Sequence, residues 1–420
     1  MTSAETAEQP LERSRFVGVD LARLLAIAGM MAAHLITIVT WDPFAPESAL
    51  SVAAVTDTLT DGIAAPLFAV LGGLSAVFAT RRLHPERHAG PAITAVAVRG
   101  ALILLLGLWL GMLDDPFVVV LAYYGAAMLL VAPLIAARGW LIAAIAVVLG
   151  LAGGPLNAAV RAALDIDGFE GRAVSFATFG ADWTEAIRAL LLTGIYPAIT
   201  WAVYLLAGVL AGRALVAAGR SGTLTRLATG LAVAGAVLAA TAQLSSNLVR
   251  ANPVSYGYNP AGPIGPEAFA ESGSGAPLST ELWAQLLATP HSGSPVDIAR
   301  TVGIALAVIG LLVLLCDRDM TPRGARVPRL LDVLRSTGAA PLTIYALHIW
   351  VTAWSLGPVL RDQSLLTGDT LPWWAFGPDA FALQLAVAIA IGAVLSFTGR
   401  RGPLEALLSD TVALAVGRGR

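Results

Sequence analysis

The chain has 420 residues, of which 57% are hydrophobic and only 13% are charged, and its mean hydropathy is +0.75. A soluble domain carries about 25% charged residues, so this composition excludes one and indicates an integral membrane protein. The net charge is −2, and nucleic-acid binding finds no support, because the arginines are spread over many segments and form no single basic face. The single cysteine, Cys316, excludes an internal disulfide and a cysteine metal site.

Apolar runs of about 20 residues predict the transmembrane helices. The predicted spans cover residues 16–40, 62–80, 92–113, 117–137, 140–155, 193–216, 224–244, 296–316, 338–358 and 376–397. We therefore expect an all-α polytopic membrane protein with about ten transmembrane helices.

Arginine is the only basic residue besides histidine, and it is concentrated in alternate gaps between the predicted spans. The gaps around 81–87 and 317–337 are rich in arginine, whereas the intervening gaps are acidic or neutral. This positive-inside pattern predicts an even number of spans in the cell membrane, with both termini cytoplasmic. The first span is long and retains charge, so we expect an uncleaved helix rather than a signal peptide.

The predicted domain organisation is simple. Residues 1–15 form a cytoplasmic tail, 16–400 a single transmembrane domain, and 401–420 a second cytoplasmic tail. Two long outer loops are expected near 156–185 and 245–295; the second is rich in Gly, Pro, Ser and Asn and should contain a short helix around 282–287. Glycines spaced four apart, at 107 and 111 and at 208 and 212, predict close helix packing.

Three ionisable residues lie inside the first span, namely Asp20, Arg23 and His34. Asp20 and Arg23 can pair within one helical turn, and His34 lies on the same side about 16 Å further along. Membrane helices rarely keep such residues unless they face a cavity. We predict an anion clamp made by Arg23, held by Asp20, and by Arg99, although Arg99 could equally be an interface anchor.

The other histidines divide into two kinds. His348 follows Tyr345 in the ninth span, and His291 lies just before the eighth, on the outer side. A lone intramembrane histidine can also simply bond to a neighbouring helix. His84 and His88 are separated by a proline, so we expect a solvated loop there and no metal site.

These residues, in this order, resemble the membrane-bound acyltransferases, the superfamily of the bacterial sugar O-acyltransferases and the heparan-alpha-glucosaminide N-acetyltransferase-like proteins. The likeness is strongest to the actinobacterial N-acetyltransferase-like type. The motifs that carry it span nearly the whole chain and are Arg15-x4-Asp20-x2-Arg23-x10-His34, Ala65-Pro66-Leu67-Phe68-Ala69-Val70-Leu71-Gly72-Gly73, Tyr123-Tyr124-Gly125, Tyr196-Pro197-x3-Trp201-x2-Tyr204, His291-Ser292-Gly293, Leu342-Thr343-Ile344-Tyr345-Ala346-Leu347-His348 and Gly402-Pro403-Leu404-Glu405.

The resemblance implies transfer of an acyl group, expected to be acetyl, from cytoplasmic acyl-CoA to a hydroxyl or amine of a sugar, amino sugar or lipid-linked envelope component. The first-helix arginine and histidine of the sugar O-acyltransferases fall on Arg23 and His34. The heparan-type enzyme has its proposed active histidine in the outer loop between its first two helices. No histidine lies between His34 and His84 here, so the acyl-histidine route is not expected to transfer.

Within this hypothesis, His34 is the general base, while Tyr345 or His348 orients the acceptor or stabilises the oxyanion. We expect acceptor contacts from His291, Tyr196 and Trp201. Two alternatives stay open: a transporter or flippase with a polar path through the membrane, and a non-catalytic relative of the family. A homodimer and contacts with membrane lipid are also expected.

Overall fold

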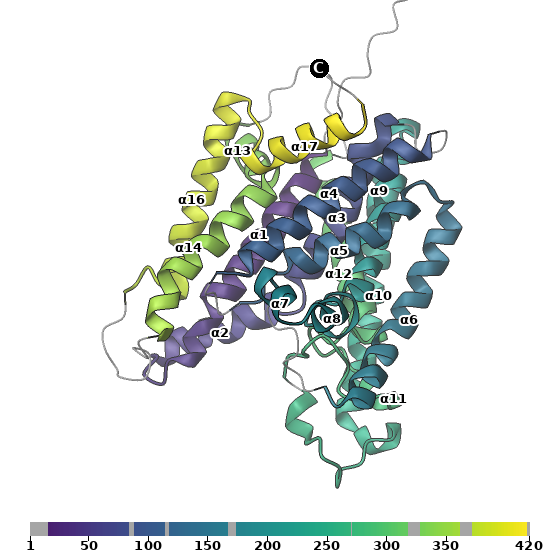
Figure 1. Ribbon diagram of the computed structural model, residues 1–420, viewed down its shortest axis with the longest axis vertical. Helices are drawn as coiled ribbons and strands as arrows, with labels where there is room; N and C mark the ends of the chain where they lie inside the picture. The colour runs from purple at the N-terminus through teal and green to yellow at the C-terminus, as the bar shows by residue number, and fades with distance from the viewer. Residues whose placement is uncertain are drawn as a thin grey trace, which may run out of the picture.

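The structure of the protein is a computed structural model that describes residues 16–83, 88–113, 117–166, 174–269, 271–317, 328–361 and 372–417. Every regular element in these ranges is helical, which confirms the predicted all-α class (Figure 1). Nine segments of the described chain are long and apolar enough to cross a membrane, and a further apolar helix, Leu121–Ala136, is shorter. The protein is therefore a polytopic membrane protein.

An apolar helix lies at every one of the predicted spans, because a continuous apolar run in hydrocarbon must satisfy its backbone hydrogen bonds internally. These helices are α1 (Val17–Leu35), α3 (Ala64–Thr80), α4 (Ala89–Leu110), α5 (Leu121–Val131), α6 (Gly139–Leu164), α9 (Ala198–Ser221), α10 (Leu224–Ala251), α12 (Pro295–Asp317), α14 (Pro341–Arg361) and α16 (Gly377–Thr398).

Further helices connect and cover these ten. They are α2 (Glu47–Thr60), α7 (Phe176–Ala181), α8 (Trp183–Arg188), α11 (Leu282–Gln285), α13 (Arg329–Gly338) and α17 (Pro403–Ala415). Single 3₁₀ turns occur at Thr37–Trp41, Arg81–Leu83, Ala132–Ala136, Pro253–Tyr256 and Pro266–Phe269, and one π turn at Ala189–Thr193. Only α11 had been predicted. Helix α17 forms most of the predicted C-terminal tail and contacts α4 and α14.

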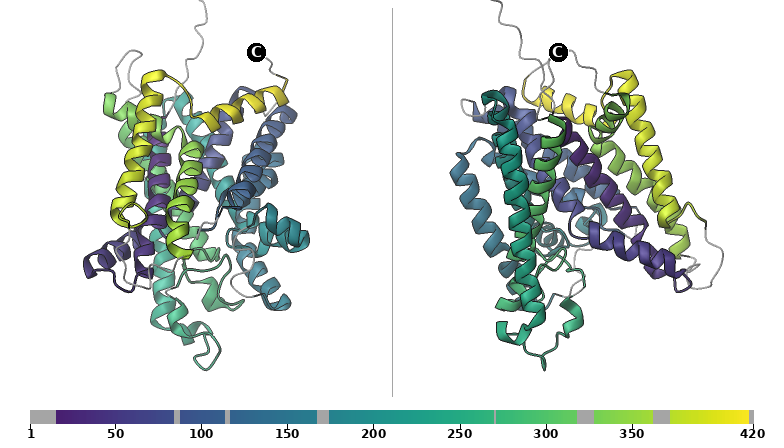
Figure 2. Two further views of the ribbon diagram at one scale, coloured as in Figure 1. Left: turned by 60° about the vertical axis from the view of Figure 1, so that its left-hand side comes forward. Right: turned by 180° about the vertical axis from the view of Figure 1, so that it is seen from behind.

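The bundle has two distinct ends, which Figure 2 shows from two sides. The arginine end carries α13 and α17 together with Arg81, Arg82, Arg400 and Arg401. The loop end carries α2, α11 and the long segment 252–294.

Helix α6 continues well past the predicted end at residue 155, although Pro155 lies inside it. The continuation holds the long loop by hydrogen bonds. The Asn157 side-chain amide donates to the Gly275 carbonyl over 2.7 Å, and Arg161 donates to the carbonyls of Ser274, over 2.6 Å, and Thr193. These bonds favour the helix over the break that Gly-Gly-Pro indicates in isolation.

Helix α3 is the central element of the fold. It is buried along most of its length and packs against α9. A Cβ atom on Gly73 would lie 1.9 Å from the Leu205 carbonyl oxygen, and one on Gly208 would lie 1.9 Å from that of Val70. The two backbones therefore touch, as the glycine spacing in α9 predicted, and side chains of α3 can line cavities at both ends of the bundle.

Candidate functional site

A cavity of about 570 Å³ opens at the arginine end between α1, α3, α4, α16 and α17. Two carboxylates line it, those of Asp20 and Glu405, and they are outnumbered by its guanidinium groups. The lining arginines are Arg23, Arg81, Arg82, Arg99, Arg400 and Arg401. The excess of cationic groups makes this cavity suited to a polyanion such as a phosphorylated ligand.

The predicted pair of the first span is formed. Arg23 makes an ion pair with Asp20 and donates a hydrogen bond to the Ser75 hydroxyl over 2.9 Å. Asp20 is 2% exposed, and the cation beside it offsets part of the cost of burying its carboxylate. Asp20 thus fixes the direction of the Arg23 side chain, which lines the cavity.

Arg99 is in a different situation. Glu405 lies in the same cavity, but its carboxylate is occupied by the first turn of α14. It accepts from the Leu342 N–H over 2.6 Å and from the Thr343 hydroxyl over 2.6 Å. Among the described residues, Arg99 makes no hydrogen bond or ion pair. Its guanidinium donors are therefore available to an anionic ligand.

A second cavity, of about 50 Å³, continues from the first, because Arg23, Arg99 and Glu405 line both. It extends away from the arginine end to Phe68 and Tyr124. A Cβ atom at Gly72 would lie 1.9 Å from the Tyr124 hydroxyl, so this glycine makes the room that Tyr124 occupies. The arginine-lined cavity thus narrows into an aromatic passage.

A third cavity, of about 20 Å³, lies at the loop end, and the three predicted acceptor-binding residues line it together. The Tyr196 ring contacts Trp201 at 5.5 Å and His291 at 5.4 Å between centroids, both edge to face. The Trp201 ring in turn meets Tyr124 of the second cavity, edge to face at 6.5 Å. One aromatic contact therefore separates the second and third cavities.

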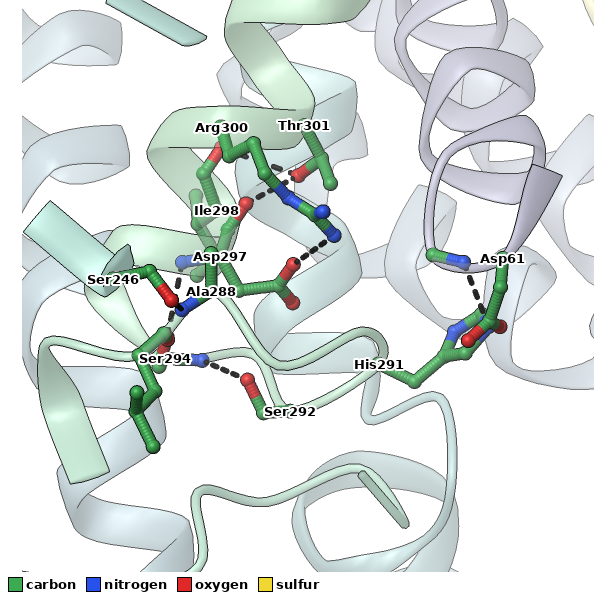
Figure 3. Close-up of polar contacts among 12 residues, drawn as sticks. Asp61, Ser246, Ala288, His291, Ser292, Ser294, Asp297, Ile298, Arg300 and Thr301 are labelled. Atoms are coloured by element: carbon green, nitrogen blue, oxygen red, sulfur yellow. Dashed lines mark hydrogen bonds and ion pairs between the residues drawn. The ribbon is translucent and has the colours of Figure 1, made fainter. Parts of the chain in front are cut away.

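His291 pairs with an acidic residue that the sequence analysis did not single out. Its Nε2 lies 3.0 Å from Oδ1 of Asp61, the residue that ends α2 (Figure 3). The Gly62 N–H also lies 3.2 Å from Nε2. Burial lowers the pKa of His291, but the hydrogen bond and charge of Asp61 outweigh it, and the net shift raises the pKa above its usual range. The pair therefore favours a protonated imidazole.

The loop that carries His291 is held rigidly at the start of α12. Asp297 accepts a hydrogen bond from the Gly293 N–H over 3.1 Å. It also forms an ion pair with Arg300 over 3.5 Å (Figure 3). Ser294 donates to the Leu287 carbonyl over 2.6 Å. His291 itself has a φ of 58°, a left-handed conformation that costs a non-glycine residue energy. The surrounding bonds hold it in this conformation.

His34 and His348 meet each other rather than His291. His34 Nδ1 lies 3.0 Å from His348 Nε2, and His348 Nδ1 lies 2.7 Å from Oε1 of Gln384 on α16. The His34 ring also stacks on Phe117 at 4.4 Å. Because an amide oxygen only accepts, His348 donates to Gln384 and accepts from His34, which leaves Nε2 of His34 basic. The two histidines line none of the three cavities described above.

Tyr345 lies between these groups and the aromatic passage. It is 1% exposed, and its ring stacks on Phe68 with centroids 6.4 Å apart. Phe68 lines the second cavity, so Tyr345 is directly behind the wall of that passage.

The three cavities follow one another along α3. Thr80 lines the first, Ser75 and Gly72 the second, and Gly62, just before the helix, the third. At 1.5 Å per residue these 18 positions span about 27 Å, close to the hydrocarbon thickness of a bilayer. Of the nine sequence-predicted residues, Asp20, Arg23 and Arg99 line the first cavity and Tyr196, Trp201 and His291 the third, whereas His34, His348 and Tyr345 line none of the three.

Sequence reasoning missed Asp61, Asp297 and Arg300. A signal for the last two was present, because Asp297 and Arg300 repeat the three-residue spacing of the first-span pair. Of the remaining histidines, His88 is exposed, and His84 lies outside the described residues. No three His, Cys, Asp or Glu side chains within the described ranges are grouped so that they could hold a metal ion.

Residues 15–245, more than half of the chain, match the family described as heparan-alpha-glucosaminide N-acetyltransferase, catalytic. The match covers α1 to α9 and most of α10, and therefore Asp20, Arg23, Arg99, Tyr196 and Trp201. No curated protein and no solved structure matches the chain.

Proposed function

Because the chain belongs to the heparan-alpha-glucosaminide N-acetyltransferase catalytic family, we propose that it is a membrane acetyltransferase that uses acetyl-CoA. The acceptor is a hydroxyl or amine of a sugar, amino sugar or other cell-envelope component. The arginine end faces the cytoplasm and the loop end faces outward, in agreement with the positive-inside distribution of arginine.

One observation carries this proposal, the succession of three cavities along α3. An acyl-CoA has a multiply phosphorylated nucleotide at one end and a thioester at the end of a long, narrow arm. The arginine-lined cavity, at about 570 Å³, suits the first, and the narrow continuation past Tyr124 suits the second. A family enzyme that delivers acetyl groups across the membrane needs this order of features.

In the proposed complex, Arg99 and Arg23 bind phosphate oxygens through charge-assisted hydrogen bonds. Arg23 is already oriented by Asp20, and Arg99 has no competing partner among the described residues. The thioester arm passes along Phe68 and Tyr124, which line the second cavity, toward the loop end. Opening of the contact between Tyr124 and Trp201 would bring the thioester to the third cavity, where the acceptor binds.

Two histidine groups could serve as the base at that end, the pair of His34 with His348 and, separately, His291. The assignment to His34, with Tyr345 or His348 as oxyanion donor, stays a prediction. Its support is the basic Nε2 of His34, which the bond to His348 leaves free to accept a proton.

The test uses the detergent-purified full chain. Thermal unfolding is measured with and without acetyl-CoA, with desulfo-CoA as a non-reactive analogue, and thiol release is then followed on adding amino sugars. Acetyl-CoA should raise the unfolding temperature, and an acceptor should start thiol release. Binding without thiol release from any acceptor would favour a non-catalytic relative, and the absence of binding would refute the proposal.

A further inference from the structure

The outer end of the site contains a histidine and a carboxylate in the geometry of an acid–base pair. His291 Nε2 and Asp61 Oδ1 are 3.0 Å apart, and their side chains are 18% and 24% exposed. They are thus neither sealed in the core nor fully in solvent. His291 lines the third cavity beside Tyr196 and Trp201, at the far end of the path that begins at the arginines.

We infer that His291 is the general base of the transfer reaction and that Asp61 is the residue that positions and polarises it. The inference rests on the proposed function and names the residues that act at its outer end. The shorter contact, 3.0 Å to the Asp61 carboxylate, requires the proton on Nε2, so Nε2 cannot at the same time accept from the Gly62 N–H at 3.2 Å. With the proton on Nε2, Nδ1 is the basic nitrogen.

The surroundings of His291 hold it in one orientation. Its backbone has a φ of 58°, its ring is packed edge to face against Tyr196, and its loop is tied to α12 through the bond from Gly293 to Asp297. Asp61 is fixed in turn by a hydrogen bond from Ser272. Both members therefore stand in place before any acceptor arrives, as an acid–base pair requires.

Charged groups from each neighbouring element act on His291. Asp61, at the junction of α2 and α3, and Asp297, on α12, favour its protonated form, whereas Arg300 on α12 and burial oppose it. Asp57 on α2 and His34 on α1 are also within electrostatic range. The largest favourable contribution is that of Asp61, so the pKa of His291 should respond chiefly to this carboxylate.

His34 is the competing candidate, and its environment differs. It is stacked on Phe117 and bonded to His348, which is bonded to Gln384. It lines none of the three cavities, whereas His291 lines the one reached from the aromatic passage. A base must be within about 3 Å of the proton that it removes, so access to the cavity favours His291.

The proposed step balances without a further reactant. The acceptor oxygen or nitrogen attacks the thioester carbonyl carbon, and its proton passes to Nδ1 of His291. The carbon–sulfur bond breaks, the acetyl group stays on the acceptor, and the leaving thiolate takes up the proton from the imidazolium. Asp61 stabilises the transient imidazolium by its negative charge and stays ionised throughout.

The experiment compares the full-length variants His291→Gln, Asp61→Asn and His34→Gln with the wild type, with His88→Gln as the matched control in an exposed loop. Acetyl-CoA binding, by thermal shift, reports on folding and on the distant arginine cavity. Acceptor-dependent thiol release gives kcat and KM between pH 5.5 and 9.

His291→Gln should retain acetyl-CoA binding and lower kcat by about 100-fold or more, which is typical for loss of a general base. Asp61→Asn should lower kcat less and move the acidic limb of the pH–rate profile to lower pH, because the carboxylate that raises the pKa of His291 is gone. A purely structural Asp61 would leave that limb where it was.

The outcomes separate this inference from the proposed function. If the wild type turns over acetyl-CoA while His291→Gln keeps full kcat, or if only His34→Gln abolishes turnover, the inference is overturned and the function stands. An unchanged acidic limb in Asp61→Asn overturns the positioning role. If the wild type neither binds nor consumes acetyl-CoA, the proposed function itself fails.

Discussion

Replacing Arg99 with Gln should weaken acetyl-CoA binding without weakening the fold. Arg99 makes no hydrogen bond or ion pair with any other described residue, so its replacement breaks none within that part of the protein. A hydrogen bond to a charged group contributes about 1.5–3 kcal/mol, so its loss should raise Kd roughly tenfold to 150-fold.

Arg23→Gln is the informative contrast. It also removes a proposed phosphate-binding group, but in addition it breaks the ion pair with Asp20, which is 2% exposed. Breaking a buried pair costs about 3–5 kcal/mol, so this variant should lose thermal stability as well as affinity.

Both variants are measured by calorimetric titration with acetyl-CoA and by thermal unfolding without ligand. The matched control is Arg226→Gln, an exposed arginine near the start of α10 that does not line the cavity. The reasoning is refuted if Arg99→Gln binds acetyl-CoA like the wild type or loses as much unliganded stability as Arg23→Gln.

Three further outcomes follow from the packing and the electrostatics. Gly73→Ala places a Cβ 1.9 Å from a backbone oxygen of α9, so overpacking should lower the free energy of unfolding by about 1–3 kcal/mol and reduce the unfolding temperature. Gly153→Ala has open space around its Cβ and should leave both unchanged; equal unfolding curves for the two variants would refute this. Arg161→Met removes the hydrogen bonds that Arg161 donates to the carbonyls of Thr193 and Ser274. Amide hydrogen exchange in the long loop should become faster while the transmembrane helices stay protected. Unchanged exchange would show that other contacts hold the loop. Because the pKa of His291 is raised in the folded state, its pairing with Asp61 stabilises the fold most below pH 6.5. The difference in unfolding free energy between wild type and Asp61→Asn should therefore shrink as the pH rises through the folded pKa. A difference that grows with pH would contradict the raised pKa.

Hydropathy predicted the transmembrane part of the fold because each span is decided locally, by about 20 residues in hydrocarbon. Where a boundary depends on distant contacts, local reasoning failed. The predicted span ended at residue 155, but Asn157 and Arg161 keep α6 intact through hydrogen bonds to loop residues more than 100 positions away in the sequence. Helix α17 was missed for the same reason, since Glu405 binds α14 some 60 residues earlier.

The contacts of the candidate site also divide into local ones, which the sequence predicts, and distant ones, which it does not. Asp20 and Arg23 pair within one turn, so their spacing was enough to predict the contact. His34 with His348, and His291 with Asp61, are joined across 314 and 230 positions, and spacing within one helix carries no information on such pairs. The resemblance to the family predicted a common role for His291, Tyr196 and Trp201, but only the three-dimensional structure shows that they line the same cavity.

The edge-to-face contact between Tyr124 and Trp201 has a consequence for the cell that harbours this protein. A continuous aqueous channel from one membrane face to the other would dissipate the proton gradient and let water hydrolyse a thioester. On the proposed route, the Tyr124 and Trp201 rings, whose centroids are 6.5 Å apart, would form a permeability barrier inside the protein. A substrate that separates these two rings would occupy the space between them, so the bound substrate itself would prevent leakage of water and protons through the protein.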